Sequence, residues 1–124
     1  MAVAGPGGKA LRLRLSGAAR QDIEDLLAWS EDHFGQAARQ RYEALLACAL
    51  QDVADDTSRP GIQARPELGA SVFSYHLVCS RKRVAAKVMR PRHLLIARHT
   101  ASGVVDILRV LHDAMEISRH RPVS

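Results

Sequence analysis

The C-terminal half of the chain carries the residue types best suited to acid–base or phosphate chemistry. His112 could transfer a proton near neutral pH, with the adjacent Asp113 orienting its imidazole. Arg92, Arg98 and Arg109 could place positive charge beside a phosphate or a carboxylate. A metal-independent ribonuclease needs such a set of proton-transferring groups and cations. Ion pairs that only stabilise or solvate a sheet would use the same residues, and both interpretations stay open.

A denser basic run precedes these residues, between Ser80 and Arg90. Its short apolar steps follow no clean helical or strand period, so we predict a basic loop with at most one helical turn. The charge could attract nucleic acid or an acidic protein segment, but few aromatic residues accompany it and base stacking is not expected. The cations of this basic segment are Arg81, Lys82, Arg83, Lys87 and Arg90.

Charge is divided unevenly along the chain. Residues 18–56 hold three arginines against nine aspartates and glutamates, whereas residues 57–124 hold twelve lysines and arginines against four acids. This separation predicts a positively charged face that attracts anionic partners, whether nucleic acid or an acidic protein. A solvated face without a partner would show the same composition.

Several classes of function lack their motifs in this sequence. No glycine-rich phosphate loop, serine–histidine–aspartate set or pair of catalytic carboxylates can be identified, and no two of the six histidines have the i, i+4 spacing of a helical metal site. Cys48 and Cys79 lack CxxC spacing, so we expect reduced thiols. Neither a secretion signal nor a membrane-spanning stretch is evident. We therefore expect a cytoplasmic protein without metal, cofactor or membrane contact.

Composition and length predict one globular domain. Hydrophobic residues make up 47% of the chain and charged residues 25%, which is ordinary for a folded domain. Residues 1–8 are rich in glycine and should form a flexible tail, because little there could be buried to offset the cost of ordering it. The domain should occupy residues 9–124.

The first half of that domain predicts a strand followed by two helices. Apolar and basic residues alternate over 10–15, which is typical of a half-buried strand. Ser16 can cap a helix whose apolar stripe runs to Phe34 and which ends at Gly35. Apolar residues at helical spacing then continue over 38–56, so a second helix should fold back on the first as an αα-hairpin.

The second half predicts three strands. Prolines and glycines indicate a loop over 57–70, and β-branched and aromatic residues predict a strand over 72–78. Strands over 93–98 and 104–111 should pair as a hairpin across a short connection with glycine. The tail 112–124 reads as a short helix or an extended arm. The order β-α-α-β-β-β predicts an α+β fold in which an antiparallel sheet packs against the αα-hairpin.

The order of motifs along the chain carries a resemblance to a known family. A basic residue and a histidine precede an Ile/Leu-rich strand in Arg90–Ile96, and an arginine-valine-leucine-histidine string with a methionine–acid pair follows in Val105–Glu116. The remaining matching positions are Ser16, Ala18-Ala19, Asp22-Ile23, Trp29, Phe34-Gly35 and Arg119-His120. In these features, over residues 11–121, the chain resembles ParE, the plasmid-stabilisation toxin of the ParE/RelE superfamily of type II toxins. The long basic segment Ser80–Arg90 departs from the family pattern.

The resemblance implies a toxin that inhibits DNA gyrase and is neutralised by a ParD-like antitoxin. An acidic amphipathic antitoxin segment should lie across the helical hairpin and the basic sheet. In this interpretation the chain is not an enzyme, and contact with nucleic acid is secondary. The residues expected to bind the target or the antitoxin are Arg81, Arg92, Arg98, Arg109, His112, Met115 and Arg119.

RelE toxins provide the alternative, a ribosome-dependent endoribonuclease that cuts messenger RNA without a metal. RelE-type nucleases tend to carry a C-terminal tyrosine, whereas Tyr42 and Tyr75 lie elsewhere in this chain, which favours the ParE interpretation. A third hypothesis is a degenerate toxin that only binds its antitoxin. The catalytic residues of the nuclease alternative would be Arg92, Arg98, Arg109 and His112.

Overall fold

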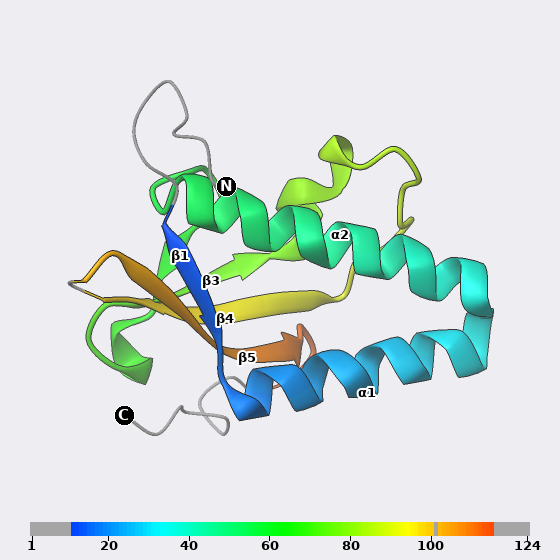
Figure 1. Ribbon diagram of the computed structural model, residues 1–124, viewed down its shortest axis with the longest axis horizontal. Coiled ribbons are helices and arrows are strands. Elements are labelled where there is room, and N and C mark those ends of the chain that lie inside the picture. Colours follow the sequence, from blue (N-terminus) through cyan, green and yellow to red (C-terminus); the bar gives the residue numbers. More distant parts are fainter. Residues whose placement is uncertain (1–10, 101, 116–124) are drawn as a thin grey trace.

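The computed structural model describes residues 11–100 and 102–115, in which two helices lie across one face of a five-stranded sheet (Figure 1). The predicted α+β class is confirmed. The tail over residues 1–8 and the arm after residue 115 lie outside the described residues. The elements in chain order are β1 (Arg12–Leu15), α1 (Gly17–Phe34), α2 (Gln36–Asp55), β2 (Gln63–Ala64), the 3-10 turn η1 (Pro66–Leu68), β3 (Val72–His76), the 3-10 segment η2 (Leu77–Arg83), β4 (His93–His99) and β5 (Val104–His112).

The sheet is mixed, which corrects the expectation of a purely antiparallel one. Its strand order is β1-β5-β4-β3-β2, and β2 to β5 are antiparallel neighbours, but β1 runs parallel to β5 with Leu15 opposite Ile107. A tight hairpin forces its two strands to be antiparallel, whereas β1 and β5 are the first and last strands and no turn joins them. The entry to α1 fixes their contact, because the Ser16 N–H donates to the Ile107 carbonyl at 3.0 Å.

The helical hairpin begins and turns where the sequence predicts. Ser16 caps α1, since its hydroxyl accepts from the Ala19 N–H at 2.9 Å. The chain turns at Gly35, whose φ of 91° lies in the left-handed region that favours glycine. Phe34, which the apolar spacing placed on the buried stripe, is instead 69% exposed, because the last turn of α1 extends beyond the strands (Figure 1). The core between helices and sheet includes Leu26, Leu45, Leu46, Val53, Tyr75, Leu95 and Ile107.

The opposite face of the sheet carries a smaller apolar cluster, and the loop predicted over 57–70 contributes to it. That loop is more regular than expected, because Pro66 opens the turn η1 and β2 pairs with β3. Both elements are too short to give a periodic pattern in the sequence. They bring Leu68 onto the sheet, where it packs with Val72, Leu94, Ile96 and Leu111.

Candidate functional site

Three neighbouring strands each have a histidine at the strand end that lies on the same side of the sheet. β3 ends at His76, β4 begins at His93 and β5 ends at His112. The antiparallel register places His93 opposite His112, and His76 opposite the residue after His93. Tyr42 on helix α2 bonds to one of these histidines. We call the group formed by Tyr42, His76, Arg92, His93, His112 and Asp113 the sheet-end cluster.

His93 is neutral because it is buried, and Tyr42 bonds to its ring. The Tyr42 hydroxyl accepts from the Arg92 backbone N–H at 3.1 Å and lies 2.7 Å from His93 Nδ1. The phenol proton is therefore left to donate to Nδ1, which assigns the ring proton of His93 to Nε2. Burial, followed by the neighbouring His112, lowers the pKa of His93 to about 4. Burial also raises the pKa of the Tyr42 hydroxyl. His93 is thus an uncharged hydrogen-bonding residue at neutral pH.

His112 is held by the turn that follows β5 rather than by Asp113. Its Nδ1 accepts from the Ala114 N–H at 3.0 Å, whereas the nearest Asp113 oxygen lies 3.7 Å away, too far for a hydrogen bond. The expectation that Asp113 orients His112 is therefore wrong. The His112 ring packs edge-on against His93 and its side chain is 38% exposed. In the neutral ring the proton therefore resides on Nε2.

Asp113 instead joins His76 to Arg92. Its carboxylate accepts from His76 Nε2 at 3.0 Å and from Arg92 Nε at 3.0 Å, and Arg92 Nη2 lies 2.9 Å away. The His76 Nδ1 accepts from the Val78 N–H, so Nε2 carries the donated proton. The bond from His76, reinforced by Arg92, lowers the pKa of the Asp113 carboxyl. Asp113 thereby ties together the ends of β3 and β5 and the residue before β4.

Arg109 lies outside the sheet-end cluster, in an ion pair with α1. Its Nε and Nη2 donate to the two carboxylate oxygens of Asp22 at 2.7 and 2.9 Å. Asp22 also accepts from the Val110 backbone N–H at 2.9 Å, on the part of β5 that extends past β1. This bidentate pair raises the pKa of Arg109 and fastens α1 to the sheet. The arrangement corresponds to the stabilising interpretation of Arg109.

Arg98 and Arg81 also lie outside the sheet-end cluster, each in a different part of the fold. Arg98 is opposite Asp106 in the sheet, and its Nη2 lies close to Gly69. The carboxylate of Asp106 is bound by Arg14 at 2.6 Å, which lowers the Asp106 pKa. Arg81 Nε donates to the Val88 carbonyl at 2.6 Å, and this hydrogen bond joins the two ends of the basic segment. Of the remaining predicted residues, Met115 is half-exposed directly after the cluster and Arg119 lies outside the described residues.

A buried carboxylate anchors the basic segment to α2. Asp52 is 1% exposed and accepts from the Ser80 hydroxyl at 2.6 Å. It also pairs with Arg83 at 2.9 Å and with Arg59 at 3.3 Å. Ser80 in turn bonds to the buried Tyr75 hydroxyl. The segment predicted as a basic loop therefore starts as η2 and is fixed at its N-terminal end by this network.

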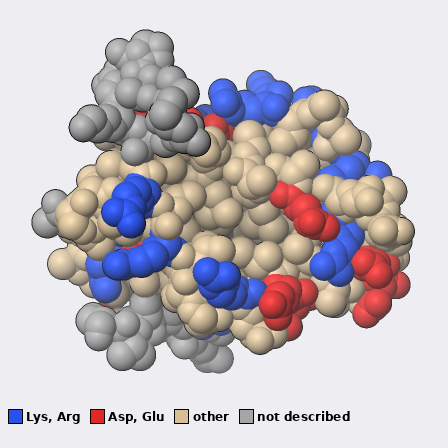
Figure 2. Space-filling model, viewed as in Figure 1, with Lys and Arg blue, Asp and Glu red and all other residues tan. Residues whose placement is uncertain are grey.

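The surface charges follow the division in the sequence. Figure 2 shows lysine and arginine side chains along the edge over η2 and the segment that follows it. Acidic side chains gather toward the end where α1 and α2 meet, where Arg39 pairs with both Glu31 and Glu43. The basic edge and the acidic end of the helical hairpin offer partners two different surfaces.

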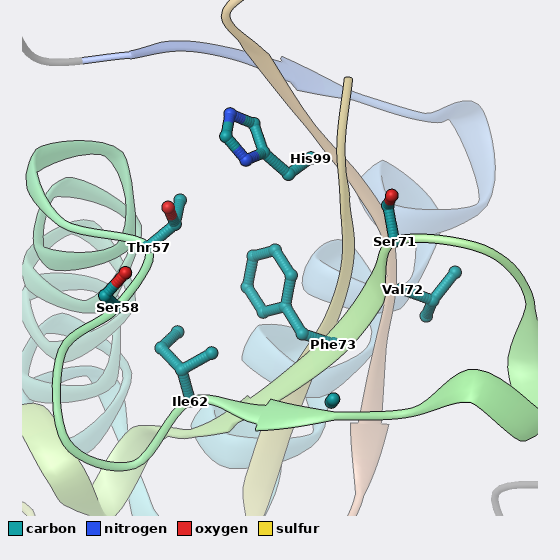
Figure 3. A pocket seen from close by; sticks show the side chains of 8 residues that line it. Thr57, Ser58, Ile62, Ser71, Val72, Phe73 and His99 are labelled. Carbon is teal, nitrogen blue, oxygen red and sulfur yellow. The ribbon is translucent and has the colours of Figure 1, made fainter. Parts of the chain in front are cut away.

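A cavity of about 340 Å³ lies at the other end of β3 and β4 from the sheet-end cluster (Figure 3). Phe73 and Ile62 form its apolar side, and its polar side chains are Thr57, Ser58, Ser71 and His99. None of the predicted site residues lines it. Its lining includes no aspartate, glutamate, lysine or arginine side chain.

Residues 11–100 and 102–115 fit neither a metal site nor a membrane-spanning helix. No group of three or more His, Cys, Asp or Glu side chains is arranged to hold a metal ion in this part of the chain. Likewise, no helix in it combines the length and apolarity needed to cross a membrane.

Of the predicted residues that the structure describes, Arg92 and His112 are therefore the ones brought together in the cluster. It adds Tyr42, His76 and His93, which the candidate set lacked. The hairpin pairing could have revealed His93, because strands starting at 93 and ending near 111 place it opposite His112. Tyr42 gave no signal, because its apolar spacing predicts only burial on α2.

Comparisons with known proteins agree with this architecture. A family model described as the ParE toxin of the type II toxin–antitoxin system, parDE, matches residues 13–117. The chain is similar to the toxin–antitoxin complex RelBE2 from Mycobacterium tuberculosis, with 23% identity, a TM-score of 0.52, and coverage of 83% of this chain and 98% of that one. It is also similar to an arginine-to-alanine double mutant of the E. coli toxin RelE in the free state, with 10% identity, a TM-score of 0.54, and coverage of 91% and 94%. At these identities the likeness concerns the fold. No curated protein matches the chain.

Proposed function

The chain belongs to the ParE toxin family of type II toxin–antitoxin systems, and from this premise we propose that it inhibits DNA gyrase by direct protein contact. A ParD-like antitoxin would neutralise it, and the pair would serve plasmid stabilisation in the cytoplasm. The proposed working surface is the basic edge together with the sheet-end cluster and Met115.

The observation that supports contact rather than catalysis is the bonding of the candidate groups within the fold. Arg109 is bidentate to Asp22, and Arg92 is bonded to Asp113. His93 is neutral and accepts a hydrogen bond from the Tyr42 hydroxyl. A nuclease would need cations and proton-transferring groups free around one phosphate. Here their release would break bonds that hold α1 and the strand ends.

The antitoxin contact rests on the basic segment. Its cations lie on an edge that Asp52 holds in place, and Val78 and Met89 expose apolar surface beside them, with Met89 81% exposed. An acidic amphipathic segment could bury these side chains and pair with the lysines and arginines. We expect antitoxin affinity to fall with added salt, as charge pairing requires.

A paired assay tests the proposal. Purified toxin is added to reconstituted gyrase supercoiling and cleavage reactions, and messenger RNA is followed after induction in cells without antitoxin. We expect loss of supercoiling or trapped cleavage with intact transcripts. Cut transcripts with normal gyrase activity would instead establish the ribonuclease alternative.

One feature of the site favours that alternative as the second candidate. His112 is partly exposed beside the half-exposed Arg92, so a proton donor and a cation could meet one phosphate there. Arg98 and Arg109 would then not take part from their present positions. His112→Ala should abolish transcript cutting if this activity exists, while gyrase inhibition should survive it if contact alone is responsible. A chain that affects neither gyrase nor transcripts would be a degenerate toxin that only binds antitoxin.

A further inference from the structure

Two of the chain's five Phe, Trp and Tyr side chains are exposed together at the end of α1. Trp29 is 54% exposed and Phe34 is more exposed still. The Trp29 ring stacks on His33 with centroids 4.1 Å apart and meets Phe34 edge-on at 5.6 Å. His33 Nδ1 lies 2.8 Å from the Trp29 carbonyl oxygen, so it donates there and its ring is held in place. We call Trp29, His33 and Phe34 the aromatic tip.

The aromatic tip projects from the molecule. Residues 31–37 are all exposed, and the turn between α1 and α2 extends past the ends of the strands (Figure 1). Single exposed apolar side chains are common and need no explanation. Three rings that pack on one another, on a projecting turn, form a patch that the core does not use. Aromatic side chains presented in this way are typical of protein interfaces.

The charges around Trp29 indicate what the tip would bind. Asp25 and Asp32 stand four residues before and three residues after Trp29, which places them on its face of the helix. Within the described residues neither carboxylate forms an ion pair, and Asp25 only accepts from Gln21 at 2.9 Å. His33 covers one face of the indole, so the opposite face is left for a guanidinium group, which could stack on the ring and pair with a neighbouring carboxylate.

We propose that the aromatic tip docks onto an arginine-bearing surface of the toxin's target protein. Trp29 would lie against a guanidinium, Phe34 would enter an apolar depression, and Asp25 and Asp32 would pair with the cation. This inference rests on the proposed function, namely inhibition by protein contact. An acidic antitoxin segment does not fit the same place, because its carboxylates would face Asp25 and Asp32. The target would therefore contact the aromatic tip in addition to the basic edge, whereas the antitoxin would contact the basic edge without the tip.

The test compares three double variants in the gyrase supercoiling assay and in growth arrest after induction. Trp29→Ser/Phe34→Ser removes the rings, Asp25→Asn/Asp32→Asn removes the charge, and Trp29→Phe/Phe34→Tyr keeps both rings as the matched control. We expect about a tenfold or greater loss of potency for the first, the effect of truncating an aromatic hot spot, and a few-fold loss for the second. The control should stay within about twofold of the parent, and all three should bind antitoxin as the parent does.

The outcomes separate this inference from the proposed function. If the parent inhibits gyrase and the ring-free variant inhibits it equally, the inference is overturned and the proposed function stands. If the parent leaves gyrase unaffected, the proposed function fails, and growth arrest then decides the inference: loss with the ring-free variant supports it, and unchanged arrest overturns it. A parent that does not arrest growth overturns both.

Two other occupants of the aromatic tip are tested separately. Trp29 is the only tryptophan of the chain, so its fluorescence with a tryptophan-free antitoxin reports an antitoxin bound at the tip. Sedimentation of the toxin alone, compared with that of the ring-free variant, reports a second copy bound there. An antitoxin-dependent shift of the Trp29 emission would place the antitoxin there. Self-association that depends on the rings would place a second copy there. Either result would overturn the proposal, whereas an unchanged spectrum and a concentration-independent monomer support it.

Discussion

Replacement of Asp22 by alanine should destabilise the toxin through the loss of one well-formed ion pair. The carboxylate accepts two hydrogen bonds from Arg109 and one from the Val110 N–H, at 2.7 to 2.9 Å. Its side chain is only 15% exposed and that of Arg109 is 27% exposed. Hydrogen bonds to charged groups contribute about 1.5–3 kcal/mol, and partners left unpaired cost a further amount of similar size. With partial hydration of Arg109, we expect a loss of about 2–4 kcal/mol.

Urea unfolding of a double-mutant cycle measures this effect. The cycle comprises the parent, Asp22→Ala, Arg109→Ala and the double variant, and we expect a coupling energy of about 1–2 kcal/mol. Asp25→Ala is the control, because Asp25 is exposed and bonds only to Gln21, so its effect should stay within about 0.5 kcal/mol. A coupling energy below about 0.5 kcal/mol would refute the argument that the Arg109 side chain stabilises the fold. Arg109 would then again be a candidate for binding a phosphate or a partner.

Three further predictions concern the sheet-end cluster and the loop before β2. The pKa of His93 is lowered to about 4, below its unfolded value, so the stability that the neutral ring contributes is present above about pH 6.5 and is lost as the pH falls toward 4. His93→Gln should therefore flatten the dependence of the urea unfolding midpoint on pH in this range. Parallel midpoint profiles for the parent and the variant would contradict this prediction. Tyr42→Phe should cost about 1–2 kcal/mol, because it leaves the His93 Nδ1 and a backbone N–H unpaired, and an unchanged unfolding midpoint would show that water replaces the hydroxyl. Gly61→Ala should lower Tm, because φ is 100° and the new Cβ would lie 2.6 Å from Cys79 Sγ, whereas Gly17→Ala meets open space and should not.

Local signals were sufficient to predict most of the fold. Ser16 marks the start of α1, Gly35 marks its end, and the glycine connection marks the hairpin of β4 and β5. These features depend on a few neighbouring residues and on periodicity. The direction of β1 and the pairing of β2 depend on contacts between distant segments, and two-residue strands leave no periodic pattern. These features, together with the exposure of Phe34, were not predicted correctly from the sequence.

The candidate site was less predictable than the fold for the same reason. A sequence identifies Arg109 as a cation, but its partner Asp22 lies 87 residues away on a helix whose rotation over the sheet is set by packing. The choice of Asp113 for His76 rather than for its neighbour His112 is likewise a tertiary contact. Spacing can therefore propose which side chains have suitable chemistry, while only the folded chain decides which of them are already bonded.

The division between bonded and unbonded charge bears on how this toxin could act. A guanidinium engaged by a buried or half-buried carboxylate adds little to the field that a partner meets, and its release for phosphate binding would cost the stability that the pair provides. Arg109 is bound by Asp22, and Asp52 binds Arg83 while it fixes the start of the basic segment. The field is then supplied mainly by lysines and arginines whose backbone is anchored but whose charges remain at the surface. Such a surface attracts an acidic protein segment without presenting the convergent geometry that RNA cleavage requires, and this favours inhibition by contact over catalysis.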